Sequence, residues 1–107
     1  MLNVKGIDMS DNREVVQIVI SKLKPVASRE RFIELTKEMK QWFLTQDGFI
    51  AYEVYENKHN WADKIVYENN DAADRINHLF MKTKIAKEML ELVEPDFSGF
   101  IGTNVDV

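Results

Sequence analysis

The sequence has no cysteine, only two prolines and only four glycines among its 107 residues. The absence of cysteine excludes thiolate metal ligands, thiol nucleophiles and disulfide redox chemistry. The glycines Gly6, Gly48, Gly99 and Gly102 are scattered along the chain. None of them opens a helix after a strand, so the sequence lacks a glycine-rich loop that would bind phosphate.

Long hydrophobic runs are missing as well. No apolar stretch approaches the length of a membrane span, and the first residues do not show the charged start and apolar core of a signal peptide. We therefore expect no membrane partner and, by default, a cytoplasmic location. Fourteen basic and eighteen acidic residues give a net charge of −4. Because both signs are interspersed, the basic stripe of a nucleic-acid binder is absent.

The chain is long enough for one domain that buries about two-thirds of its unfolded surface. Residues 1–13 are predicted to form an N-terminal arm and residues 14–107 the domain itself. Hydrophobic periodicity, caps and turn residues predict seven elements in this domain. They are strand 14–22, helix 28–44, strand 49–56, strand 61–68, a helix from about 71 to 80, helix 84–93 and strand 97–105.

This order is the βαββαβ arrangement of a ferredoxin-like α+β fold, with an antiparallel sheet and helices on one face. The first strand carries apolar residues on both faces, with Gln17 as the polar exception. Glu53, Asp63 and Lys64 interrupt otherwise apolar strand faces, which suits a sheet that meets water, a second sheet or a ligand. Helices cover only one face of such a sheet, so a second copy of the chain is expected to cover the other.

The segment from Ile65 to Phe80 runs from a buried strand into a short helix that carries His78. The apolar residues of this helix recur at steps of three and four: they are Ala72, Ala73, Ile76, Leu79 and Phe80. This pattern predicts that His78 lies beside the apolar face and is partly buried. It is then either a packed side chain or a titrating group in a pocket between helix and sheet. His59 and His78 are nineteen residues apart with a strand between them, so they do not form a local metal-binding pair.

From about Val15 to Val105 the chain resembles the antibiotic biosynthesis monooxygenase superfamily of dimeric α/β barrels. The resemblance rests on the following residues: Gly48-Phe49 at the start of the second strand, its continuation AYEVYE, Tyr67-Glu68 at the end of the third strand, His78-Leu79 late in the next helix, and Pro95.

The sequence departs from this family at identifiable positions. Asn69 stands where many members have a tryptophan after the third-strand glutamate. The haem-degrading branch has a tryptophan at the position of His78 and its axial histidine near Glu88, and neither match holds here. The resemblance therefore argues against haem degradation, whereas the branch that acts on quinols or polyphenols has a histidine comparable to His78.

The resemblance implies oxygenation of a small aromatic quinol or polyphenol by dioxygen, without metal, flavin or another cofactor. In this hypothesis His78 is the catalytic base that removes a phenolic proton, and the substrate is bound by Tyr52, Tyr67, Asn69 and Gln17. Two alternatives stay open. One is a non-enzymatic dimer that binds a small ligand, and the other is an isomerase or decarboxylase that uses His78 as a proton shuttle.

Overall fold

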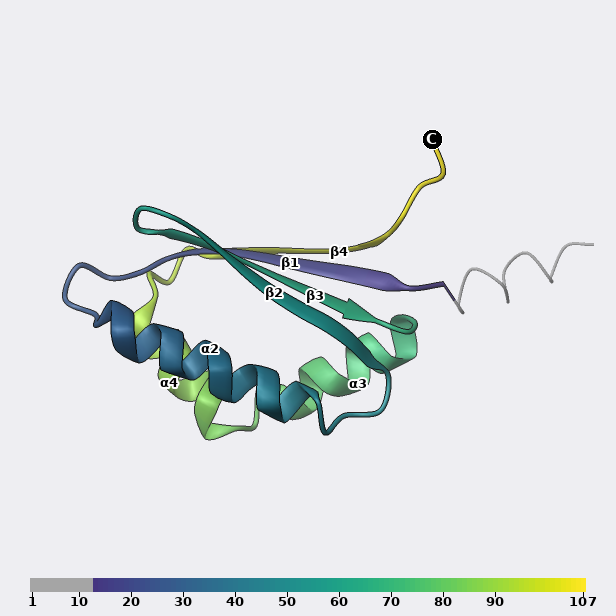
Figure 1. The fold of residues 1–107 in the computed structure, drawn as a ribbon, viewed down its shortest axis with the longest axis horizontal. Coiled ribbons are helices and arrows are strands. Elements are labelled where there is room, and N and C mark those ends of the chain that lie inside the picture. Colours follow the sequence, from purple (N-terminus) through teal and green to yellow (C-terminus); the bar gives the residue numbers. More distant parts are fainter. Residues whose placement is uncertain (1–12) are drawn as a thin grey trace, which may run out of the picture.

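The computed structural model describes residues 13–107, so the predicted N-terminal arm lies outside the described residues except for Arg13. Four strands and three helices follow one another in the described part of the chain (Figure 1). They are β1 (Val15–Lys22), α2 (Arg29–Phe43), β2 (Phe49–Asn57), β3 (Asn60–Tyr67), α3 (Asn70–Phe80), α4 (Lys84–Leu92) and β4 (Ser98–Thr103).

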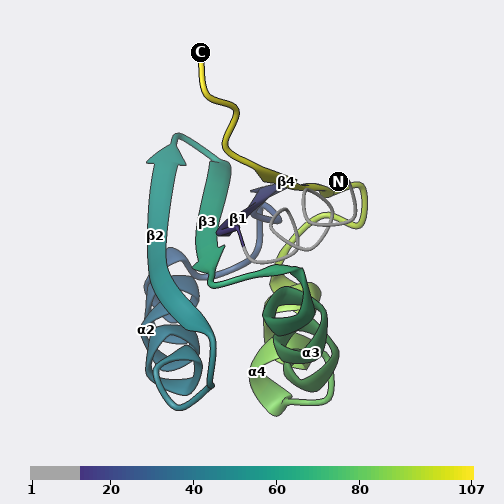
Figure 2. The same ribbon diagram turned by 90° about the vertical axis from the view of Figure 1, so that its right-hand side faces the viewer.

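The strands form one antiparallel sheet in the order β2-β3-β1-β4. All three helices lie on the same face of this sheet (Figure 1). Seen from the end, α2 lies beneath the β2 side, and α3 and α4 lie beneath the side of β1 and β4 (Figure 2). The ferredoxin-like α+β prediction is confirmed. None of the helices within residues 13–107 is both long and apolar enough to cross a membrane.

Each helix begins at a polar side chain that accepts a hydrogen bond from the first turn. Ser28 Oγ accepts from the Arg31 amide at 3.1 Å, and Asn69 Oδ1 accepts from the Ala72 amide at 2.8 Å. Thr83 Oγ1 plays the same part for α4, at 3.1 Å from the Ala86 amide. Such caps satisfy amides that have no partner inside the helix, so they fix where each helix starts.

The core lies between the sheet and the helices, and its centre is aromatic. The ring of Phe43 on α2 packs against Phe49 at 5.3 Å, Phe80 at 5.5 Å and Tyr52 at 5.6 Å, measured between ring centroids. These contacts connect α2, α3 and β2 through one buried side chain. Aromatic pairs at such distances add to the stabilisation that burial alone provides.

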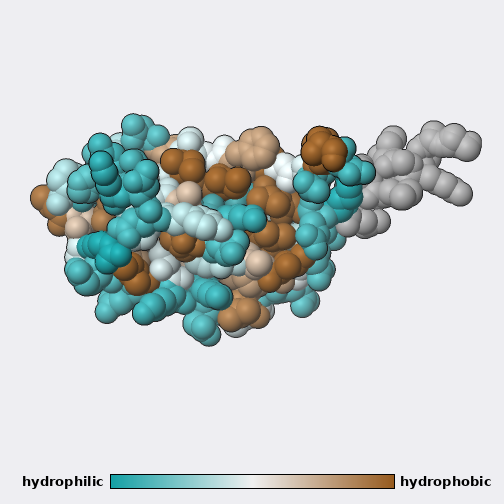
Figure 3. Space-filling model, turned by 45° about the horizontal axis from the view of Figure 1, so that its top comes forward, coloured by the Kyte–Doolittle hydropathy of each residue, from teal (hydrophilic) through white to brown (hydrophobic). Residues whose placement is uncertain are grey.

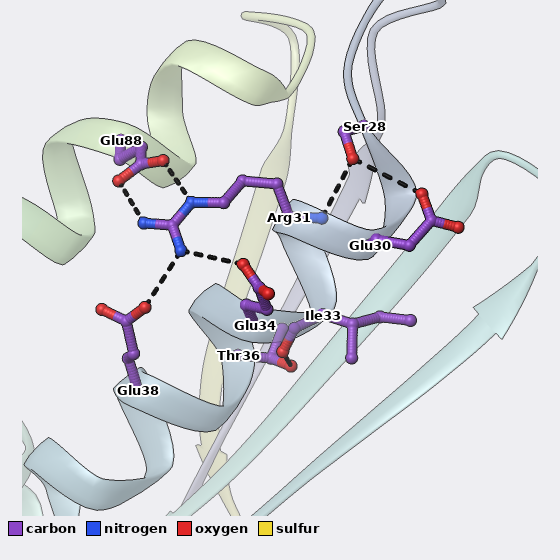
Figure 4. Close-up of polar contacts among 8 residues, drawn as sticks. All are labelled: Ser28, Glu30, Arg31, Ile33, Glu34, Thr36, Glu38 and Glu88. Carbon is purple, nitrogen blue, oxygen red and sulfur yellow. Dashed lines mark hydrogen bonds and ion pairs between the residues drawn. The ribbon is translucent and has the colours of Figure 1, made fainter.

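The short helix α4 is held at two places. Arg31 on α2 donates to both carboxylate oxygens of Glu88 on α4, through Nε at 2.6 Å and Nη2 at 2.7 Å (Figure 4). The same guanidinium contacts Glu34 and Glu38 on its own helix. After α4, the Glu94 amide donates to the Lys22 carbonyl at 2.8 Å, which ties the chain to the end of β1. The ion pairs lower the pKa of Glu88 through its hydrogen bonds with Arg31.

The sheet face opposite the helices is apolar and largely open. Ile20 is 46% exposed and Phe100 is 64% exposed, and Val16 and Ile18 on the same face of β1 are only partly covered. Hydrophobic side chains are visible along this face among polar ones (Figure 3). Every helix of the described residues packs on the other side of the sheet, so the chain itself leaves this face open. That a second copy of the chain covers it stays a prediction.

We expect Gly48→Ala to destabilise the protein by about 2 to 3 kcal/mol, because Gly48 has a φ of +93° and a methyl group there would lie 2.5 Å from the Ala72 Cβ. Urea denaturation measures this loss. Gly99→Ala is the matched control, since the nearest atom to its new methyl group would be 3.9 Å away. Equal losses in the two variants would contradict this account of Gly48.

Candidate functional site

A cavity of about 200 Å³ lies between the helix-facing side of the sheet and the three helices. Its walls are mostly apolar and aromatic, and four polar residues, Gln17, Ser21, Asp63 and Asn77, break this surface. The apolar lining comes from every helix and from the sheet: Phe32, Met39, Phe43, Phe80, Ala86, Met89 and Ile65 are among its members. An apolar cavity with a few polar groups is the usual form of a small-molecule site.

The cavity opens to the surface between α3, α4 and the start of β4. Met81, Leu90 and Phe97 line it and are also substantially exposed, which places them at its mouth. At about 200 Å³ the space is smaller than the typical site for a drug-sized ligand. It therefore suits one small molecule.

The phenol of Tyr67 links two of the polar lining residues. Its hydroxyl donates to Gln17 Oε1 at 2.6 Å and accepts from Asn77 Nδ2 at 3.3 Å. The same Asn77 amide nitrogen donates to the Ala73 carbonyl at 2.9 Å. Tyr67 is completely buried, and burial raises the pKa of its phenol, so it stays a neutral donor. Because the Gln17 carbonyl oxygen is bound to Tyr67, the orientation of its amide group at the cavity wall is fixed.

The second polar feature is the carboxyl group of Asp63 on β3. Asp63 is 8% exposed, and its Oδ1 has no hydrogen-bond partner among the described residues. The nearby Tyr52 hydroxyl on β2 also lacks a partner of acceptable geometry, although it is close enough to interact with this carboxyl. Burial raises the pKa of Asp63 to about 7, against the smaller lowering effect of Tyr52. Near neutral pH this group can therefore both give and take a proton.

The predicted site residues take different positions. Gln17 lines the cavity, Tyr67 holds Gln17 in place, and Tyr52 lies beside Asp63. Asn69 does not line the cavity, and its side-chain oxygen caps α3. Gln17, Tyr67 and Tyr52 therefore lie on the helix-facing side of the sheet, whereas Asn69 and the predicted base do not belong to this group.

That predicted base, His78, is exposed and is absent from the cavity wall, so the prediction that it is partly buried is wrong. The buried face of α3 is set by Ala72, Ala73 and Ile76. His78 is two residues beyond Ile76 and therefore lies roughly 200° around the helix from it. Its catalytic role stays a prediction that no observation tests.

Three polar lining residues, Ser21, Asp63 and Asn77, were not predicted to belong to a site. The signal for Asp63 is present in the sequence, since it alternates with Trp61, Ile65 and Tyr67, all of which are buried. For Asn77 the sequence offers only its place at the edge of the apolar stripe of α3. Its contact with Tyr67 depends on tertiary packing. Among residues 13–107, no cluster of three or more histidine, aspartate and glutamate side chains is arranged to hold a metal ion.

Comparison with known proteins identifies the fold. SnoaB of Streptomyces nogalater, a cofactor-independent oxygenase, superimposes with a TM-score of 0.74 at 14% identity, covering 89% of this chain and 96% of SnoaB. A structure described as an antibiotic biosynthesis monooxygenase gives 0.70 at 13% identity, covering 86% and 99% of the two chains. The chain has the fold of the antibiotic biosynthesis monooxygenase superfamily.

Rv0793 of Mycobacterium tuberculosis has this fold as well, with a TM-score of 0.74 at 19% identity and coverage of 88% of this chain and 97% of that one. No protein-family model and no curated protein sequence matches the chain. The likeness therefore lies in the arrangement of strands and helices. Activity and substrate have to be argued from the cavity itself.

We expect Asp63→Asn to make the free energy of unfolding less dependent on pH. The folded state holds the Asp63 proton up to about pH 7, whereas the unfolded chain releases it near 3.8. Stability of the native protein therefore falls as pH rises between these values, by up to about 4 kcal/mol. Urea denaturation at about pH 4.5 and about pH 8 should show that the variant gains stability relative to the native protein as pH rises. Asp74→Asn, at an exposed position of α3, controls for the loss of one negative charge. A difference between Asp63→Asn and the native protein that does not change with pH would contradict this view of Asp63.

Proposed function

We propose that the protein is a cofactor-independent monooxygenase that oxidises a small aromatic quinol or polyphenol with dioxygen inside the cavity. The observation that carries this proposal is an apolar, aromatic cavity of about 200 Å³ interrupted by a fixed amide and a carboxyl group. The description of SnoaB as a cofactor-independent oxygenase on the same fold supports it.

The cavity suits this chemistry because oxidation by dioxygen begins from an electron-rich phenolate. The apolar rings of Phe32, Phe43 and Phe80 exclude water and hold a flat substrate. The Gln17 amide, positioned through Tyr67, supplies a donor for an oxygen atom that becomes negative during the reaction. Proton removal from the substrate is then the step that the protein has to provide.

The reaction balances without any further reductant. The phenolate gives one electron to dioxygen, and the resulting radical and superoxide combine by forming a C–O bond at an unsubstituted ring carbon. The O–O bond then breaks as the hydrogen on that carbon leaves, and water is released. One oxygen atom ends in the product and the other in water, so a quinol becomes a hydroxyquinone. The substrate supplies all four electrons.

The test is oxygen consumption by the purified protein with a panel of quinols and polyphenols. Ala86 lines the cavity and is buried, so Ala86→Leu fills part of the space and should lower the rate at least tenfold. Lys87→Leu places the same side chain at the exposed neighbouring position and should leave the rate unchanged. His78→Ala measures the role that the sequence predicted for this residue.

Absence of oxygen uptake with every compound would overturn the proposal. Thermal stabilisation of the protein by the same compounds would then favour the ligand-binding alternative, because a ligand that binds only the folded state raises its stability. Chemical change of a compound without oxygen uptake would favour the isomerase or decarboxylase alternative.

We further propose that the protein works as a homodimer that joins two sheets through their outer faces. The open apolar side chains of this face, Ile20 and Phe100 among them, favour a partner surface of the same kind (Figure 3). A dimer is expected in sedimentation at micromolar concentration. Phe100→Glu should give monomers, whereas Val26→Glu, at a 93% exposed apolar position outside the sheet, should not. A native protein that sediments as a monomer would contradict the dimer.

A further inference from the structure

Among the described residues, one carboxyl group lines the cavity, that of Asp63, and no cationic side chain pairs with it. Asp63 projects from β3 toward the helices, between the buried side chains of Trp61 and Ile65. Its neighbour in the β1 register is Val19, and the remaining polar lining residues, Gln17, Ser21 and Asn77, carry no charge.

No basic side chain of the described residues contributes to the pKa of Asp63. The titratable group that faces it is the phenol of Tyr52 on β2, and the lining residues of α2, α3 and α4 have no charge. Burial of a carboxyl group without a cation or a good hydrogen-bond donor lowers the stability of the folded protein. An apolar residue at this position would pack better in the core. Asp63 lines the cavity and is 8% exposed, so a donor that arrives with a ligand can reach this residue.

We infer that Asp63 accepts the hydroxyl proton of the aromatic molecule bound in the cavity, first as a hydrogen bond and then as a transferred proton. This inference rests on the proposed function, and it assigns to Asp63 the role that the sequence suggested for His78. In the transfer, the hydroxyl O–H bond breaks and the proton joins a carboxylate oxygen. The electron pair stays on the substrate oxygen, and the protein acquires a neutral carboxyl group.

The surroundings of Asp63 fit this role. A base is most effective when its pKa lies near the working pH, and burial raises the pKa of Asp63 to about 7. The Tyr52 hydroxyl favours the charged form of Asp63, so it adjusts the pH at which the carboxylate becomes available. Tyr52 is thus a positioning residue, since it does not line the cavity.

The test compares phenol with its methyl ether, anisole, in binding experiments under nitrogen, where no oxidation takes place. The two molecules have the same ring, but only phenol can donate a hydrogen bond. In the native protein, the preference for phenol over anisole should rise by about tenfold between about pH 5.5 and about pH 8.5, as Asp63 becomes a carboxylate. In Asp63→Asn the preference should not change with pH. Tyr52→Phe should move the rise to higher pH.

A preference for phenol that does not change with pH in the native protein, or that rises equally in Asp63→Asn, would overturn the inference.

The same variants are then compared in oxygen uptake. Asp63→Asn should lower the rate on the order of a hundredfold and remove its dependence on pH near 7, because a positioned base contributes about that much. Asp74→Asn, at an exposed position of α3, should preserve both the rate and its pH dependence. Equal uptake by the native protein and Asp63→Asn would likewise contradict the role of Asp63.

The two proposals fail in distinguishable ways. If the native protein consumes no oxygen but shows the pH-dependent preference for phenol, the monooxygenase proposal is wrong and the proton-accepting contact of Asp63 stands. If oxygen uptake is present and the preference is absent, the monooxygenase proposal stands and another group removes the proton.

Discussion

The alternation of side chains along β3 is the constraint on which the rest of the structure depends. Successive residues of a strand point to opposite faces, so Trp61, Asp63, Ile65 and Tyr67 must all face the helices once one of them does. Three large side chains of this set are buried in the core, and their burial brings the carboxyl group inside with them. The chemistry of the cavity is thus a consequence of strand register. A shift by one residue would exchange this set for Ala62, Lys64 and Val66.

Most of the fold could be predicted from the sequence because its signals are local. The Ser28 cap, the turn at Gly48 and the amphipathic stripe of α2 each act within a few residues, and the structure confirms the helix they define. The error at His78 came from counting Leu79 as part of the buried face, although Leu79 is 40% exposed. α3 has eleven residues and its buried side chains are mostly small. Assigning one exposed residue to the buried face therefore rotates that predicted face toward His78.

The site could be predicted less well because it is assembled from distant parts of the chain. Gln17 and Tyr67 are fifty residues apart in sequence and meet through their hydroxyl and amide groups, with Asn77 as the third member. No local pattern encodes such a set. Asp63 was visible as a polar residue in an apolar strand, but its environment depends on which sheet face the helices cover. That choice is made by tertiary packing, which gives the carboxyl group its unusual proton affinity.

The cavity is also a gap in the hydrophobic core, since Phe32, Phe43 and Ile65 belong to both. Space of about 200 Å³ that contains no packed atoms would lower stability by up to about 5 kcal/mol if it stayed empty. Substitutions that fill this space would make the folded state more stable and at the same time reduce the volume available to a ligand. The stability of the core and the binding of a ligand therefore place opposite demands on the same few side chains. A molecule bound in this space would complete the packing of the core and raise the stability of the folded state, so that the occupant would become a structural component of the protein.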